Sequence, residues 1–125
     1  MNNWLIVALG GACGAMSRYA LNRAVAWLVP AAANFPFATL LENSVGAFCA
    51  GFLAVFITER LAEGQALRLL LSVGFLGAFT TFSAFSVETM SLLGRGDVTK
   101  ALLNVVLNVC LCLWLCSLGM QLVRR

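Results

Sequence analysis

The chain has 125 residues, of which 62% are hydrophobic and only 10% are charged, and its mean hydropathy is +0.95. A soluble domain of this size needs far more charge to cover its surface, so the composition indicates an integral membrane protein with about four spans of about 20 residues. A net charge of +3 without a long basic run gives no support to nucleic-acid binding, and the absence of histidine leaves no proper ligand set for zinc or copper.

The first predicted span covers residues 4–29 and ends before a proline. No basic stretch of the kind that opens a signal peptide precedes it, so we expect a retained helix. Gly10 and Gly14 have the spacing that allows helices to approach closely in lipid. Arg23 is expected to reach the interface, whereas Arg18 lies deeper and should face protein or water.

The second predicted span covers residues 37–60. Polar and small side chains follow one face at helical spacing, namely Thr39, Asn43, Gly46 and Ala50. Asn43 is a candidate either for hydrogen bonding between helices or for a site. Glu42 is unexpected, because a carboxylate in an apolar segment should be neutral, paired with an arginine or near water. It lies about 100° around the helix from Asn43, so the two need not share a face.

The third predicted span covers residues 66–93 and follows a polar connector made of Glu59, Arg60, Glu63, Gly64 and Arg68. The span is longer than the hydrocarbon requires. Its stretch from Gly74 to Glu88 reads GFLGAFTTFSAFSVE and places hydroxyl side chains among phenylalanines. In hydrocarbon, such clusters persist only where they are buried in protein or line a wet cavity. The excess length, Gly74, Gly77 and the threonine pair together predict a helix interrupted within the membrane.

The fourth predicted span covers residues 98–123. Asn104, Asn108 and Cys112 recur every four residues and form a polar stripe on an apolar helix. This span also carries Cys110 and Cys116. We expect these thiols to pack as small hydrophobic groups rather than to form disulfides or a metal site.

The positive charges are divided almost evenly between the two sides of a four-span topology. One side carries four, Arg60, Arg68, Arg124 and Arg125. The other side carries three, Arg23, Arg95 and Lys100, or four when the deeper Arg18 is included. The bias that normally fixes orientation is therefore nearly absent, and such a chain could insert both ways and pair with an inverted copy of itself.

Four stretches, one in each predicted span, resemble signatures of the CrcB/Fluc fluoride channels, and the resemblance extends over nearly the whole chain. GFLGAFTTFSAFSVE at residues 74–88 resembles the third-helix signature, whose TTFSxFSxE pattern is specific. GGACGAMSRY at 10–19, FATLLENSVGAF at 37–48 and ALLNVVLNV at 101–109 resemble the signatures of the first, second and fourth helices. The resemblance implies an all-α, dual-topology antiparallel homodimer in a bacterial inner membrane, with two separate pathways through which fluoride leaves the cell passively.

The resemblance also implies roles for individual residues along the fluoride pathway. Phe82 and Phe85 would present electropositive ring edges, which attract an anion without the full charge that would trap it. Asn43 would donate its amide to fluoride, and the hydroxyl groups of Thr81 and Ser83 could supply further donors.

Two further groups of residues follow from the same resemblance. On the fourth helix, Asn108 and Cys112 match positions that would form the polar side of the fluoride pathway. Gly77 and Thr80 match positions whose backbone carbonyls hold a central sodium ion at the dimer interface. Glu88 and Arg18 match a family glutamate and a first-helix arginine, and no firm role is assigned to either.

The chain departs from the family pattern at four positions. Glu42 stands where a small or apolar residue is usual, and an anionic Glu42 near the pathway would repel fluoride, so we expect it to be protonated, paired or turned away. Leu111-Cys112 stands where Gly-Ser is common, and a thiol is a poorer donor than a hydroxyl. Ala78 replaces a frequent glycine, which is a milder change.

Two other functions are compatible with parts of the sequence. Small proton-coupled exporters of cationic compounds are also four-helix antiparallel dimers, but they place an essential carboxylate in the first helix, where this chain has no acidic residue. A non-transporting scaffold would use the polar stripes only to hold helices together. Catalysis is not indicated, because no pairing of nucleophile and base is evident.

Overall fold

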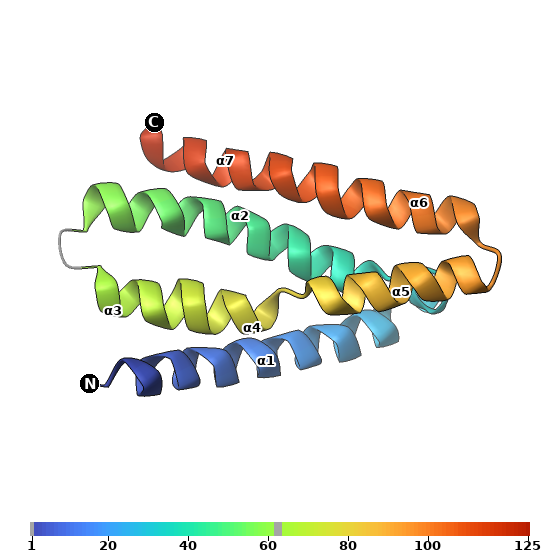
Figure 1. The fold of residues 1–125 in the computed structure, drawn as a ribbon, viewed down its shortest axis with the longest axis horizontal. Helices are drawn as coiled ribbons and strands as arrows, with labels where there is room; N and C mark the ends of the chain where they lie inside the picture. Colours follow the sequence, from blue (N-terminus) through green and yellow to red (C-terminus); the bar gives the residue numbers. More distant parts are fainter. Residues whose placement is uncertain (1, 62–63) are drawn as a thin grey trace.

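The computed structural model describes residues 2–61 and 64–125, and its fold is drawn in Figure 1. Within these residues the regular secondary structure is helical throughout, and four helical segments are long and apolar enough to cross a membrane. They span Asn3–Leu28, Phe37–Arg60, Gln65–Gly94 and Val98–Arg124. The prediction of an all-helical chain with four such segments is confirmed. Glu63 of the predicted connector lies outside the described residues.

The four segments are divided into shorter elements. The first two are α1 (Asn3–Leu28) and α2 (Phe37–Arg60), with a short 3₁₀ helix, η1 (Pro30–Ala33), between them. The third comprises α3 (Gln65–Leu67), the π-helical η2 (Arg68–Leu76), α4 (Gly77–Phe79) and α5 (Phe82–Gly94). The fourth comprises α6 (Val98–Val106), the π-helical η3 (Leu107–Leu111) and α7 (Cys112–Arg124).

Successive segments run in opposite directions, so both termini lie at the same end as the last turn of α2 and the start of α3 (Figure 1). The first segment packs mainly on η2 and α4, whereas α2 packs mainly on α7 and α5 packs on α6. The third segment therefore contacts α1 on one side and α2 on another.

Glycines set the closest helix contacts. A Cβ on Gly10 would overlap the carbonyl oxygen of Leu70, and one on Gly14 would overlap the carbonyl oxygen of Phe75. From the facing helix, a Cβ on Gly74 would lie 2.9 Å from the Cα of Gly10. The close approach predicted from the spacing of Gly10 and Gly14 is confirmed, because the backbones of α1 and η2 leave no room for side chains here.

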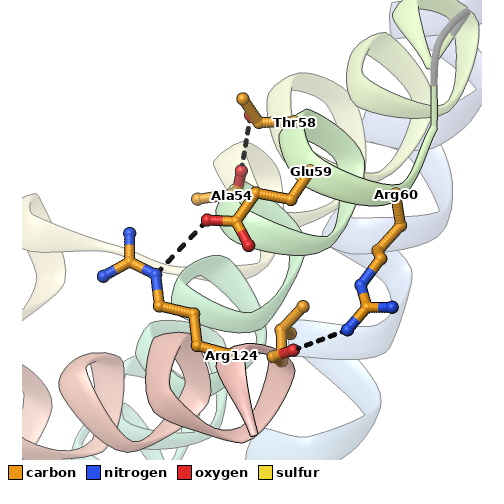
Figure 2. A network of polar contacts seen from close by, with 6 residues as sticks. Ala54, Thr58, Glu59, Arg60 and Arg124 are labelled. Atoms are coloured by element: carbon orange, nitrogen blue, oxygen red, sulfur yellow. Dashed lines mark hydrogen bonds and ion pairs between the residues drawn. The ribbon is translucent and has the colours of Figure 1, made fainter.

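A second close contact joins α2 to α7. A Cβ on Gly51 would overlap the carbonyl oxygen of Cys116, and one on Gly119 would overlap the carbonyl oxygen of Phe48. At the outer end of this pair, Arg124 Nε donates to Glu59 Oε1 at 3.3 Å and an Arg60 guanidinium nitrogen donates to the Val123 carbonyl at 3.3 Å (Figure 2). The Arg124–Glu59 contact is exposed and contributes little, so close backbone packing at the glycines is the main contact between these helices.

Replacing Gly14 by alanine should reduce the free energy of unfolding by about 1–3 kcal/mol, because the added methyl group forces apart two packed backbones. Thermal unfolding in detergent measures this loss. Gly11→Ala is the matched control, since the nearest atom to its Cβ is the Gly74 carbonyl oxygen at 3.9 Å, an ordinary contact. Equal losses in the two variants would contradict this description of the interface.

Candidate functional site

The third segment stops being helical at two residues. Thr80 has φ −81° and ψ 156°, and Thr81 has φ −152° and ψ 118°, so both are extended. Gly77 has helical angles of −61° and −31°, and Gly74 lies within η2. The predicted interruption is therefore present in this segment, and the threonine pair forms it, while the two glycines remain helical. Figure 1 shows it as the extended link between α4 and α5.

At this break, side-chain oxygens accept the hydrogen bonds of two backbone N–H groups. The Thr81 N–H donates to Asn43 Oδ1 at 2.9 Å, and Asn43 Nδ2 donates back to the Thr81 carbonyl at 3.1 Å. The Ala84 N–H donates to Thr81 Oγ1 at 3.1 Å and so caps α5. In a continuous helix these two N–H groups would donate to the carbonyls of Gly77 and Thr80. Those carbonyls consequently lack their usual helical donors.

A cavity of about 240 Å³ lies beside the break, lined by Asn43, Thr80, Thr81, Phe82, Phe85, Asn108, Val109 and Cys112. It brings together six of the seven residues that the resemblance places on a fluoride pathway; Ser83 is the exception. The rings of Phe82 and Phe85 are tilted by 53° with centroids 5.2 Å apart. Phe85 is buried, whereas Phe82 is 77% exposed and projects from the chain.

The polar groups of this cavity already bond to one another. Besides the Thr81 carbonyl, Asn43 Nδ2 donates to Asn108 Oδ1 at 2.9 Å, so both of its amide hydrogens are engaged within the chain. Cys112 Sγ lies 3.9 Å from Ser44 Oγ. The amide of Asn43 therefore holds the break in place, in addition to any contact it makes with an ion.

A second cavity, of about 390 Å³, shares Thr81 with the first. Its lining is Arg18, Asn22, Thr39, Glu42, Thr81, Ser83, Ala84, Val87 and Glu88. Ser83, the seventh predicted pathway residue, lies here, and its hydroxyl is 3.3 Å from that of Thr81. All three of the remaining candidates, Arg18, Glu42 and Glu88, line this cavity as well. The break thus separates an aromatic cavity from a charged one.

Comparison with known proteins decides the family. Residues 5–120 match the model of the family described as CrcB-like protein, Camphor Resistance (CrcB). The chain belongs to this family. It is similar to the fluoride-specific ion channel FluC of Shewanella baltica (strain OS185), with 46% identity over 98% of this chain and 97% of the relative. It is also similar to the FluC protein of Magnetococcus marinus, with 49% identity over 94% of each chain.

The second cavity of this CrcB-like chain holds two carboxylates with incomplete hydrogen bonding. Glu42 is fully buried, and Asn22 Nδ2 donates to its Oε1 at 2.5 Å. Thr39 Oγ1 donates to Glu88 Oε1 at 2.6 Å. Within the described residues, the Oε2 atom of each carboxylate is buried without a hydrogen-bond partner. The direct partner of Glu42 is the Asn22 amide and not the expected arginine.

Glu42 and Asn43 use different faces of α2, in agreement with their angular separation. Glu42 reaches Asn22 on α1, whereas Asn43 reaches the break and the fourth segment. The five cysteines are free thiols, and Cys110, one of the three expected to pack, is exposed.

Sequence reasoning missed two residues that complete the contacts of these segments: Asn22, which donates to Glu42, and Thr89, whose hydroxyl accepts from Asn104 Nδ2 at 2.9 Å. Thr39 and Asn104 were recognised only as members of polar helix faces. Asn22 lies one helical turn after Arg18, and Thr39 lies one turn before Asn43. The signal available in the sequence was a polar residue one helical turn away from a candidate site residue. It could have identified Asn22 as a neighbour of the site, but it could not have paired Asn22 with Glu42 or Thr39 with Glu88.

Removing the donor to Glu42 should destabilise the chain. Asn22→Leu leaves both oxygens of a buried carboxylate without a donor, and we expect a loss of about 1–3 kcal/mol in the free energy of unfolding. The double variant Asn22→Leu/Glu42→Met replaces both partners with apolar groups and should recover most of this loss. Thermal unfolding of the two variants in detergent measures the difference, and a double variant no more stable than Asn22→Leu would show that the contact is unimportant.

Proposed function

We propose that this CrcB-like chain is a fluoride-selective, non-enzymatic channel through which fluoride leaves the cell passively, limiting its toxicity. The observation that carries the proposal is the cavity beside the break, which gathers Phe82, Phe85, Asn43 and their neighbours from three helical segments. The relatives named as fluoride-specific ion channels, which align over nearly the full chain, support the same activity.

The tilted phenylalanine pair supplies the attraction for the ion. The edge of an aromatic ring is electropositive, so Phe82 and Phe85 can stabilise a passing anion without binding it so tightly that it cannot leave. A narrow path through this cavity strips water from the anion, and it accommodates fluoride more readily than the larger chloride.

Hydrogen-bond donors from the break replace part of the water that fluoride loses. The hydroxyl groups of Thr81 and Ser83 lie 3.3 Å apart and share one hydrogen bond, so one of them is free to turn toward the ion. Asn43 can exchange its bond to Asn108 for one to fluoride while keeping its contact with the Thr81 carbonyl. The thiol of Cys112 is a weaker donor and contributes less.

Two copies of the chain, inserted in opposite directions, would form the working channel in the bacterial inner membrane. The nearly equal positive charge on the two sides supports dual topology. Phe82 is 77% exposed on the isolated chain, although it lies next to the break. An antiparallel partner would cover this face and enclose two separate pathways, with each break near the middle of the membrane.

A sodium ion at the centre of the dimer is consistent with the backbone at the break. The carbonyls of Gly77 and Thr80 lack their usual helical donors, because Asn43 and the Thr81 hydroxyl accept those N–H groups. Carbonyl oxygens of this kind are suitable hard ligands for sodium, so the residues present fit the ion. When bound, it would supply positive charge that holds these carbonyl dipoles together. This chain's own part is to keep both carbonyls out of helical hydrogen bonds.

Liposomes that contain the purified protein should release fluoride rapidly and retain chloride, and Phe82→Ile should abolish the release because the ring edge is lost. A fluoride electrode and a parallel chloride electrode measure both ions. Phe56→Ile, a matched substitution on α2 outside the two cavities, should conduct as wild type does. Absence of fluoride release from wild-type liposomes would contradict the proposal and favour a scaffold.

A further inference from the structure

Glu42 is a buried carboxyl group that the proposed conduction does not use. Its side chain is 0% exposed. Asn22 Nδ2 donates to Glu42 Oε1 at 2.5 Å and to the Arg18 carbonyl at 3.0 Å, so both amide hydrogens of Asn22 are engaged. Glu42 Oε2 is buried and has no hydrogen-bond partner within the described residues. A neutral donor therefore holds one oxygen of this group, and the other oxygen is left without a contact.

Glu42 also has no ion-pair partner in the part of the chain that the structure describes. The ion pairs there are Lys100–Asp97 and Arg124–Glu59. Arg18 lines the second cavity together with Glu42 but does not pair with it. A buried carboxylate that carries an unpaired charge is far more costly than a neutral carboxyl group whose O–H lacks a partner. Because Oε1 already accepts a hydrogen bond, Oε2 is the oxygen on which a proton would reside.

The proton on Glu42 would set the charge of the second cavity. Of the elements packed around this cavity, α1 contributes Arg18 and α5 contributes Glu88, and the remaining lining residues are uncharged. With both carboxyl groups ionised, one positive and two negative groups leave a net charge of −1. One proton removes that charge. Glu42 is the fully buried member of the pair, whereas Glu88 is half-buried and also borders a further cavity that Arg95 lines.

We propose that Glu42 is a proton-binding site whose occupancy controls the passage of fluoride from the second cavity to the break. The two cavities share Thr81, so fluoride that takes this route passes through the lining to which Glu42 belongs. With the proton bound, the cavity is neutral and admits the anion. Without it, the net negative charge repels fluoride. Fluoride release is therefore faster in acid and slower in alkali. This inference rests on the proposed fluoride conduction.

Glu42→Gln tests the inference, because glutamine keeps an oxygen that accepts from Asn22 and cannot ionise. Fluoride release from liposomes is measured with the same pH on both sides, in steps from mildly acidic to mildly alkaline. Protein-free liposomes at each pH correct for hydrogen fluoride that leaks through the lipid. We expect wild-type release to fall by about tenfold as the pH rises, as for one added like charge near the path. Glu42→Gln should release fluoride at the acidic wild-type rate throughout.

Glu59→Gln is the matched control. Glu59 lies on the same helix, α2, but its carboxylate is exposed, bonds to Arg124 and lines neither cavity of the site. This variant should keep the wild-type dependence of fluoride release on pH. A wild-type dependence in Glu42→Gln as well would overturn the inference. If Glu42→Gln does not fold, Glu42→Met is the second neutral variant, and a wild-type dependence in Glu42→Met would overturn the inference equally.

Infrared spectroscopy of the protein in bilayers detects the proton without requiring conduction. The absorption of the protonated carboxyl group in wild type, with that of Glu42→Gln subtracted, should decrease as the pH rises. A difference band that is absent, or the same at every pH, would overturn the inference. If wild-type liposomes release no fluoride at any pH, the proposed function fails and the control of passage fails with it. Fluoride release by wild type that does not change with pH refutes the role of Glu42 alone.

Discussion

The reciprocal hydrogen bonding between the Asn43 carboxamide and the backbone of Thr81 is the constraint on which the rest of the site depends. In an apolar environment a helix cannot simply stop, because each unpaired N–H or carbonyl is costly. Here Asn43 satisfies both backbone groups of Thr81, and the Thr81 hydroxyl accepts the N–H of Ala84. The break is thereby stable as extended backbone, and two carbonyls are left without helical donors.

The break also organises the two cavities, because Thr81 lines both of them. On one side, the lining consists of phenylalanine rings, asparagine amides and other uncharged groups. On the other side, Glu42 and Glu88 each bond to a neutral donor and each keep one buried oxygen unpaired. Hydrogen bonds from Asn22 and Thr39 thus hold the two carboxylates in the second cavity. The lining of the aromatic cavity contains no acidic residue.

Sequence predicts the parts of this architecture that depend on one helix at a time. Apolar length gives four segments, and the glycine spacing of α1 gives its close approach to η2. The interruption was expected, but the sequence alone did not separate the threonine pair from Gly74 and Gly77, since all four are compatible with a break. The partners Asn22 for Glu42 and Thr89 for Asn104 were not predictable, because spacing within a helix does not determine the register between helices.

Hydrogen exchange of the Thr81 amide, measured by NMR in lipid bilayers, tests the central interaction most directly. In wild type this proton is expected to exchange slowly, because Asn43 Oδ1 accepts it at 2.9 Å. In Asn43→Val it should exchange at the rate of an unprotected loop amide. Rapid exchange in wild type, or equally slow exchange in both proteins through a helical bond to Gly77, would contradict the role assigned to Asn43.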